Sequence, residues 1–271
     1  MKKQLAIVIH SFYLDILEDL LARISKIDVD FKIYITTPIE LEDRTNILLL
    51  ENNMKYKLLV TENHGHDVYP FLQIMPYVIK AEHEIILKVH TKKSLHNRHG
   101  EIWRNDLYNK LLEPINCLKI IDKFNSDSSI GMVGPDGHVL SLEKYAGVNI
   151  RWILKLSELL GFRPIDVLDS SFVAGTMFYA RVSCIKPIID SNIDKDTFDN
   201  EEGQTDGLAI HALERLFGAS VMLQGQKILN TSLKEPTTVE LNKTHRKVLK
   251  EIRNKLKPKI TIKKIKEFIF S

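Results

Sequence analysis

One short stretch constrains the fold of this chain more than any other. The apolar run from Ile85 to Val89 is flanked by polar residues and is too short for a helix of its own, which is typical of a buried central strand. It stops at a cationic and hydrogen-bonding segment, His90 to Ser94. Because ligands bind just outside the carboxyl ends of strands in open α/β sheets, this pattern predicts a ligand site at the end of the strand.

The residues that follow this strand favour a negatively charged ligand. Lys92 and Lys93 supply point charge, and Thr91 and Ser94 supply short donors. This combination suits a diphosphate better than a neutral molecule. The alternative is a solvated turn that contains two lysines, and the stretch by itself favours neither.

Strand patterns alternate with helical periodicity through the first 130 residues. Further strands are expected at Leu5 to Ile9, Phe31 to Thr36, Tyr56 to Thr61 and Ile130 to Val133. The alternation predicts one α/β domain of three layers, with a mostly parallel central sheet, over residues 1–235. Residues 236–271 are expected to form a separate helical extension.

Composition excludes several classes of protein. No uncharged apolar run approaches the roughly 18 residues of a membrane span, and the first apolar run is too short for a signal peptide. A cytoplasmic protein is therefore expected. Cys117 and Cys184 stand far apart without metal-type spacing, which argues against a disulfide framework or a structural zinc site.

The charge is concentrated at one end of the chain. From Leu241 onward eleven basic residues face two acidic ones, a net charge of +9, which leaves −6 for the first 240 residues. Apolar positions at helical spacing among these lysines predict an amphipathic segment on an anionic membrane surface. The alternative is a helix that packs on the acidic body, on a second copy or on another protein domain. No nucleic-acid partner is expected, because aromatic residues are not interleaved with the basic ones.

Two further loops carry candidate ligand contacts. Asn63, Gly65, His66 and Asp67 crowd together after the third strand. Asp67 can cap the helix that follows, but a cap needs fewer polar residues than this loop holds. His10 ends the first strand and is either a ligand contact or a satisfied core histidine.

Small residues interrupt the apolar run from Ser170 to Arg181 at Ala174, Gly175 and Thr176. A glycine in a strand is costly unless something, such as a ligand, packs against the bare backbone. Asp136 lies in a turn-rich loop and is a possible functional carboxylate. Thr205 and Asp206 precede a helix, so either of them can be its cap, and Asp206 is alternatively a catalytic carboxylate.

The order of these motifs resembles the rhamnan synthesis F family of bacterial polysaccharide biosynthesis proteins, which is similar to the GT-A group of glycosyltransferases. The resemblance covers roughly residues 3–230. Its motifs are His-Ser-Phe-Tyr (10–13), Glu-Asn-His-Gly-His-Asp-Val-Tyr-Pro-Phe (62–71), Lys-Val-His-Thr-Lys-Lys-Ser (88–94), Trp-Arg (103–104), Gly-Pro (134–135), Phe-Val-Ala-Gly-Thr-Met-Phe-Tyr-Ala-Arg (172–181) and Thr-Asp-Gly-Leu-Ala (205–209).

The resemblance implies a GT-A-like glycosyltransferase that moves a sugar, rhamnose or similar, from a nucleotide-diphospho-sugar donor to a growing cell-surface polysaccharide such as O-antigen, capsule or rhamnan. Inversion is expected, with Asp206 as the base that deprotonates the acceptor and with Lys92 and Lys93 on the leaving diphosphate. The candidate substrate-binding residues are His10, Asn63, Gly65, His66, Asp67, His90, Thr91, Ser94, Arg104, Asp136, Gly175 and Thr176. Arg181 is either a further contact or a structural residue at a strand end.

The chain departs from the GT-A pattern at one point. Many such enzymes hold a metal with an Asp-x-Asp motif, but no carboxylate occurs between Glu84 and Glu101. The lysine pair can perform the same electrostatic task, so no metal cofactor is expected, and divalent metal dependence stays open. The departure also favours the alternative of a non-catalytic sugar- or nucleotide-binding domain in a polysaccharide synthase complex. For an enzyme, the acceptor is a glycan or lipid-linked glycan at the inner face of the plasma membrane.

Overall fold

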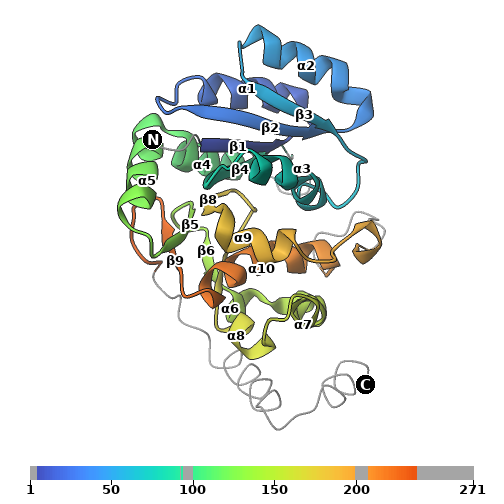
Figure 1. Ribbon diagram of the computed structural model, residues 1–271, viewed down its shortest axis with the longest axis vertical. Coiled ribbons are helices and arrows are strands. Elements are labelled where there is room, and N and C mark those ends of the chain that lie inside the picture. The colour runs from blue at the N-terminus through green and yellow to red at the C-terminus, as the bar shows by residue number, and fades with distance from the viewer. Residues whose placement is uncertain (1–4, 92, 94–99, 199–206, 237–271) are drawn as a thin grey trace.

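The computed structural model describes residues 5–91, 93, 100–198 and 207–236 (Figure 1). Its main sheet has the strand order β3-β2-β1-β4-β8-β5-β9. These strands are β1 (Leu5–His10), β2 (Phe31–Thr37), β3 (Tyr56–Val60), β4 (Ile85–His90), β5 (Ile130–Gly134), β8 (Phe178–Arg181) and β9 (Lys227–Asn230). A second, small sheet pairs β6 (Val139–Ser141) with β7 (Ser171–Val173).

The main sheet is mostly parallel, as predicted. β1 pairs in parallel with β2 and β4, β2 pairs in parallel with β3, and β5 pairs in parallel with β9. β8 runs antiparallel to both of its neighbours, β4 and β5. The carboxyl ends of β1 to β5 and of β9 therefore meet at one edge of the sheet, and both central strands β1 and β4 are buried along their whole length.

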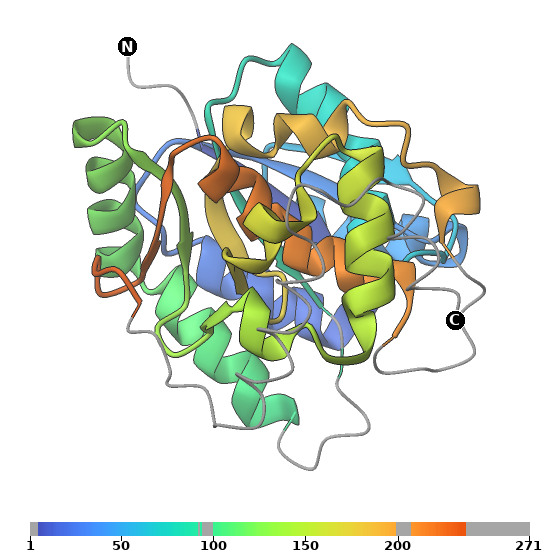
Figure 2. The same cartoon turned by 90° about the horizontal axis from the view of Figure 1, so that it is seen from below.

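Helices cover both faces of this sheet, which confirms the three-layer α/β fold (Figures 1 and 2). α1 (Leu14–Ile24), α4 (Gly100–Leu112) and α5 (Pro114–Ser126) share one core with the sheet. The other face packs α3 (Val68–Lys80), α9 (Val182–Ile189) and α10 (Ala209–Leu223). The other α-helices of the described residues are α2 (Glu42–Glu51), α6 (Leu142–Tyr145), α7 (Ile150–Leu159) and α8 (Pro164–Leu168).

α10 is the centre of the second half of the domain. It packs against α7, α9 and β7 (Figure 2). Gly218 allows this close packing, since a Cβ atom there would lie 2.1 Å from the carbonyl oxygen of Ser171. Within the described ranges no helix is long and apolar enough to cross a membrane. The predicted extension, residues 236–271, lies outside the described residues apart from Pro236.

The segment from Ser170 to Arg181 differs from its prediction as one continuous strand. It forms β7 and β8, which belong to different sheets, and a turn at residues 174–177 joins them. Gly175 and Thr176 have φ angles of +86° and +51°. Two consecutive residues in the left-handed region cannot continue a strand, so the chain turns there.

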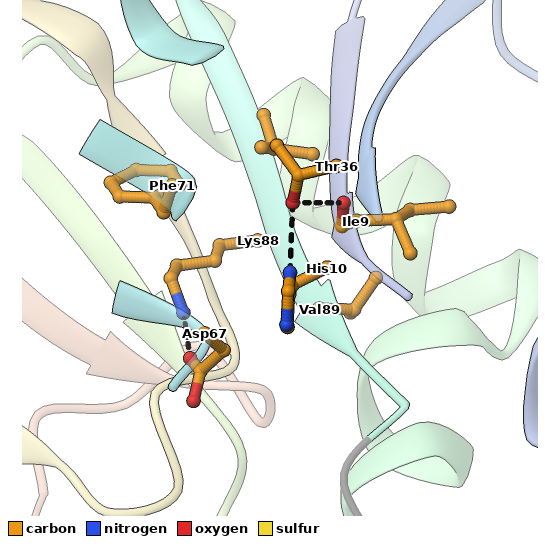
Figure 3. Close-up of a pocket in the computed structure, with 8 residues that line it drawn as sticks. Ile9, His10, Thr36, Asp67, Phe71, Lys88 and Val89 are labelled. Atoms are coloured by element: carbon orange, nitrogen blue, oxygen red, sulfur yellow. Dashed lines mark hydrogen bonds and ion pairs between the residues drawn. The ribbon is translucent and has the colours of Figure 1, made fainter. Parts of the chain in front are cut away.

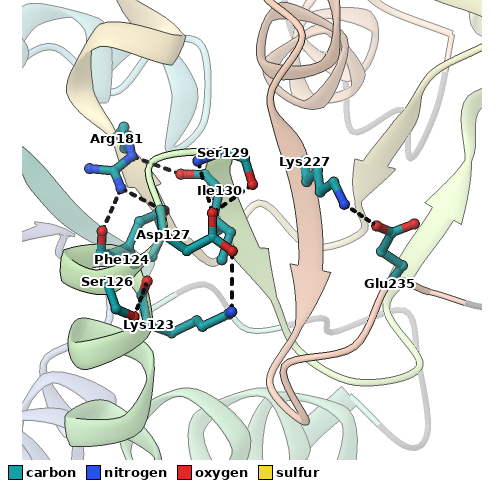
Figure 4. Close-up of polar contacts among 9 residues, drawn as sticks. All are labelled: Lys123, Phe124, Ser126, Asp127, Ser129, Ile130, Arg181, Lys227 and Glu235. Carbon is teal, nitrogen blue, oxygen red and sulfur yellow. Dashed lines mark hydrogen bonds and ion pairs between the residues drawn. The ribbon is translucent and has the colours of Figure 1, made fainter.

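Arg181, at the end of β8, has a structural role. Its guanidinium group donates hydrogen bonds to the carbonyl oxygens of Phe124 (2.5 Å), Asp127 (3.0 Å) and Ile130 (2.8 Å) (Figure 4). These contacts tie the end of α5 to the start of β5. Arg181 thus lies at the edge of the sheet opposite the carboxyl ends of the parallel strands, away from the predicted site.

Candidate functional site

Three polar side chains lie in a row at the carboxyl edge of the sheet. His10 ends β1, His90 ends β4, and Thr36 is the penultimate residue of β2. His10 is in register with both of the others, so the three side chains share one face of the sheet. The Nδ1 atom of His10 is 2.9 Å from the hydroxyl of Thr36 (Figure 3). His10 and His90, each predicted from its place at a strand end, therefore lie at the same edge of the sheet.

A buried ion pair lies beside this row. Lys88 points to the same face as His90, and its ammonium group pairs with the carboxylate of Asp67 (Figure 3). The ammonium also donates to the carbonyl oxygen of Thr176 at 3.0 Å, and the Thr176 hydroxyl donates to Asp67 at 2.8 Å. The ring of Phe71 lies 5.3 Å from the Lys88 nitrogen, close enough for a cation–π contact. Both charges therefore have several partners, as buried charges require.

Asp67 does not cap α3, contrary to the simpler interpretation of its loop. It occupies the N-cap position, but its side chain makes no capping hydrogen bond and turns to Lys88 instead. Gly65 and His66 precede it with φ angles of +68° and +49°. A Cβ atom on Gly65 would lie 2.3 Å from the Cβ of Tyr69, so the tight loop that brings Asp67 to Lys88 requires glycine.

His10 is neutral at physiological pH. Burial lowers its pKa from 6.5 to about 4; the nearby Asp67 opposes that shift, while His90, Lys88 and His66 add to it. At pH 7 the ring therefore offers one donor and one acceptor nitrogen and no charge. His10 suits hydrogen bonding to a neutral part of a ligand better than neutralising a phosphate.

His90 and Thr91 join the site to the rest of the fold. The Nε2 atom of His90 is 3.0 Å from the carbonyl oxygen of Gly175, and the Tyr108 hydroxyl donates to the His90 carbonyl at 2.7 Å. The Thr91 hydroxyl accepts hydrogen bonds from the backbone nitrogens of Phe12 (2.8 Å) and Tyr13 (3.0 Å). Thr91 is fully buried, so its hydroxyl holds the ends of β1 and β4 together.

Lys93 lies at the surface of this edge. Its ammonium group is 2.6 Å from the carboxylate of Asp15 and 4.8 Å from the centre of the Tyr13 ring. The hydrogen bond from Lys93 holds the pKa of Asp15 below its usual value. The other predicted catalytic residues, Lys92 and Asp206, lie outside the described residues, as does Ser94.

The remaining predicted residues have mixed positions. Asn63 is exposed, and His66 lies beside His211 of α10, with ring centres 5.7 Å apart. Arg104 is half-buried, and its Nε atom is buried without a hydrogen-bond partner among the described residues. Asp136 links the ends of β5 and β9, because its carboxylate accepts a hydrogen bond from the side-chain amide of Asn230 at 2.9 Å.

Sequence reasoning missed two sets of residues. Lys88 was passed over as part of an apolar run, although a lysine inside a buried strand is itself a signal that a partner exists. Asp106 and His138, whose side chains are 2.7 Å apart, also had no assigned role. In the described part of the chain, no three His, Cys, Asp or Glu side chains are grouped as metal ligands.

Comparison with solved structures finds remote similarity. Glucosyl-3-phosphoglycerate synthase from Mycobacterium tuberculosis aligns with 94% of this chain and 78% of its own, with a TM-score of 0.40 and 11% identity. A cytidylyltransferase from Leptospira borgpetersenii serovar Hardjo-bovis aligns with 96% of this chain and 99% of its own, with a TM-score of 0.41 and 12% identity. A likeness at this level carries no functional argument.

Sequence comparison is more specific. WxcX, an uncharacterised protein of Xanthomonas campestris pv. campestris strain B100, is 30% identical over 222 residues. The match covers 82% of this chain and 32% of WxcX, so the chain spans about a third of the length of this relative. The family model of rhamnan synthesis protein F matches residues 1–225. The chain therefore belongs to the rhamnan synthesis protein F family.

Proposed function

We propose that this chain is a glycosyltransferase domain that moves a sugar, rhamnose or similar, from a nucleotide-diphospho-sugar to a growing polysaccharide. The observation that carries the proposal is the polar row of His10, Thr36 and His90 beside the buried Lys88, at the carboxyl edge of a parallel sheet. That edge is where open α/β sheets bind their ligands. Membership of a family described by rhamnan synthesis supports a sugar as the group transferred.

The lysine pair after β4 is proposed to bind the diphosphate of the donor. Lys93 is available for this role, since its pair with Asp15 is exposed, with 33% and 66% of the two side chains accessible. Exposed ion pairs contribute at most about 1 kcal/mol, so a diphosphate can displace Asp15 from Lys93. His10, which is neutral, and His90 are proposed to hydrogen-bond the neutral parts of the donor.

The proposed reaction is a direct displacement with inversion. Asp206 takes the proton from an acceptor hydroxyl as its oxygen bonds to the anomeric carbon of the donor. The bond from that carbon to the diphosphate breaks, and its electron pair stays on the phosphate oxygen. Lys92 and Lys93 stabilise the negative charge that develops there. No metal is assigned to this step; a bound divalent cation would stabilise the same charge.

Replacing both lysines tests the donor half of this mechanism. Lys92→Ala with Lys93→Ala is expected to lower the rate of sugar transfer about 10²–10³-fold, which is what the loss of an electrostatic stabiliser usually costs. Lys186→Ala, in an exposed pair with Asp190 on α9, is the matched control and should leave transfer unchanged. Full activity in the double variant would assign the two lysines to solvent.

Replacing Asp206 tests the acceptor half. Asp206→Asn is expected to abolish transfer while donor binding is retained, because the base is needed only when the acceptor reacts. Donor affinity is measured by titration and transfer by product formation. Transfer near the wild-type rate would remove Asp206 from the mechanism. The alternative that Asp206 caps the helix is wrong, because α10 begins at Ala209 and Leu208 occupies its N-cap position.

A non-catalytic sugar- or nucleotide-binding domain is the second candidate function. The lack of a carboxylate between Glu84 and Glu101 favours it, since many GT-A enzymes hold their metal with acidic residues at this place. The chain also spans only a third of its curated relative, as a domain of a larger synthase would. Such a domain would bind the nucleotide sugar without turnover, and Asp206→Asn would have no effect on binding or on the absent transfer.

We also propose that residues 236–271 bind the anionic inner face of the plasma membrane, close to a lipid-linked glycan acceptor. The support is the net charge of +9 from Leu241 onward, since each basic residue near such a surface contributes about 1 kcal/mol. Sedimentation with anionic liposomes should show binding that is lost at high salt and on truncation before Leu241. An absence of binding at low salt would contradict this placement.

A further inference from the structure

Asp106, Lys110 and His138 form a second polar cluster. The turn at residues 174–177 separates it from His90 and Lys88. The Nε2 atom of His138 is 2.7 Å from the Oδ2 atom of Asp106 on α4. The same oxygen accepts a hydrogen bond from Lys110, one turn further along the helix, at 2.6 Å. Burial tends to raise the pKa of Asp106, but the hydrogen bonds from Lys110 and His138 outweigh it and hold the pKa below its usual value. Asp106 is therefore ionised at neutral pH.

This cluster shares the edge of the sheet that carries the proposed donor site. His138 follows β5, and β5 runs in the same direction as β4, because β8 opposes both. β8 separates the two strands, so β4 and β5 lie two strand spacings apart, or about 10 Å. The two clusters are thus close enough to contact two substrates that react with one another.

The turn between β7 and β8 connects the two clusters. The Ala174 nitrogen donates to the His138 carbonyl oxygen at 2.9 Å, and the Gly175 carbonyl contacts His90. The ring of Trp103 packs on Gly175, where a Cβ atom would lie 2.5 Å from the ring. The same ring meets His138 edge to face, with centres 6.0 Å apart. Trp103 and His138 therefore flank the turn opposite Lys88 and its partners.

The unused atoms of this cluster match the chemistry of a sugar. Among the described residues, both hydrogen bonds to Asp106 use Oδ2, which leaves Oδ1 to accept from a ligand hydroxyl. With Nε2 of His138 directed at Asp106, its Nδ1 atom is left to hydrogen-bond a second hydroxyl. The side chains of Asp106 and His138 are 41% and 14% accessible, so a ligand can reach them. Trp103 supplies the apolar surface that sugar C–H groups contact.

We propose that Trp103, Asp106 and His138 form the binding site for the terminal sugar of the acceptor glycan. This assignment rests on the proposed transferase function. It gives the domain two sites at one edge, with the donor at β1 and β4 and the acceptor at α4 and the end of β5. The three residues bind and position the acceptor, and the proton transfer itself belongs to Asp206.

The test uses the fluorescence of Trp103 in the full chain. Trp103 and Trp152 are its two tryptophans, so a Trp152→Phe chain reports on Trp103 alone. The probe is methyl rhamnoside, because it lacks an aromatic group that would itself quench tryptophan emission. We expect a saturable change in Trp103 emission as the sugar binds. Asp106→Asn and His138→Gln should each lower the affinity for methyl rhamnoside at least tenfold. Lys123→Met, which removes the same type of i,i+4 pair from α5 at the opposite edge, should leave the affinity unchanged.

A kinetic measurement in the chain with both tryptophans supports this experiment in case the Trp152→Phe chain does not fold. Asp106→Asn and His138→Gln should raise the KM for the acceptor at least tenfold and leave the KM for the donor unchanged. Equal sugar affinity and equal acceptor KM in the variants and the wild type would overturn the proposal. If methyl rhamnoside binds as expected but no donor is turned over, the transferase function fails while the sugar site stands.

Discussion

At the scale of single residues, Lys88 and Asp67 place two charges in the middle of an α/β domain. Each side chain is only 2% accessible. Taking such groups out of water costs several kcal/mol per ion, which their mutual attraction and further hydrogen bonds must offset. The contacts of both groups with Thr176 serve this purpose. Removing one partner should therefore destabilise the fold more than the pair itself stabilises it.

Lys88→Met is expected to lower the free energy of unfolding by about 3–5 kcal/mol, because it leaves the Asp67 carboxylate buried without its cation. Adding Asp67→Asn should recover part of this loss, since no charge then remains. Urea denaturation measures both values. Lys186→Ala, in an exposed pair, should cost no more than about 1 kcal/mol. A similar cost for the Lys186 and Lys88 variants would contradict a charged, buried pair.

His10 should make the stability of the fold depend on pH. Its pKa is about 4 in the folded protein and 6.5 as a free side chain, so the unfolded chain binds more protons between these values. Above pH 6.5 His10 is neutral in both states and does not destabilise the folded protein. As the pH falls from 6.5 toward 4, protonation of His10 favours the unfolded chain, so the free energy of unfolding decreases. Between pH 7 and pH 5 the free energy of unfolding should decrease by about 2 kcal/mol more in the wild type than in His10→Gln. Urea denaturation at the two pH values measures this decrease. An equal decrease in the wild type and in His10→Gln would show that His10 is not buried as a neutral ring.

At the scale of elements, the turn between β7 and β8 contacts both His90 and His138, which belong to the proposed donor and acceptor sites. Gly175→Ala should destabilise the protein for two reasons, the φ angle of +86° and the 2.5 Å approach of Trp103. Gly161→Ala is the matched control, because Gly161 has a φ angle of +70° and no atoms within 4 Å of its Cβ position. The control should lose about 1–2 kcal/mol, and Gly175→Ala about 1–3 kcal/mol more. Equal losses in urea denaturation would mean that Trp103 does not pack on the turn.

The elements themselves were largely predictable, because strand and helix patterns are local. The runs around Leu5 to Ile9 and Ile85 to Val89 became the two central strands. The split between β7 and β8 was not predictable from apolar character, since it depends on two consecutive residues with positive φ. Apolar periodicity does not report that property.

The candidate site was predicted in part, and the misses have one cause. Residues at strand ends, such as His10 and His90, could be found because topology brings strand ends together. The partners of Lys88 could not, because Asp67 and Thr176 lie 21 and 88 residues away along the chain. The contact between the Asp136 carboxylate and Asn230, 94 residues away at the end of β9, could not be predicted for the same reason, and substrate binding by Asp136 stays a prediction. The partner of a polar side chain is a property of the tertiary structure.

At the scale of the whole molecule, a single edge of the sheet gathers the proposed chemistry. β1 and β4 carry the proposed donor residues, and α4 with the end of β5 carries the proposed acceptor residues. β8, which runs against its neighbours, lies between the two sides and begins at this edge, directly after the turn that contacts both. The central claim is that this edge binds a nucleotide-diphospho-sugar.

Thermal unfolding of the full chain with a panel of nucleotide-diphospho-sugars, with and without Mn²⁺, tests that claim most directly. A ligand that binds only the folded state stabilises it by about 2.7 kcal/mol at a hundred times its Kd. We predict a saturable rise in Tm for at least one nucleotide sugar, and loss of that rise in His90→Ala. No rise with any nucleotide sugar, in the presence or absence of Mn²⁺, or an equal rise in His90→Ala, would contradict the account.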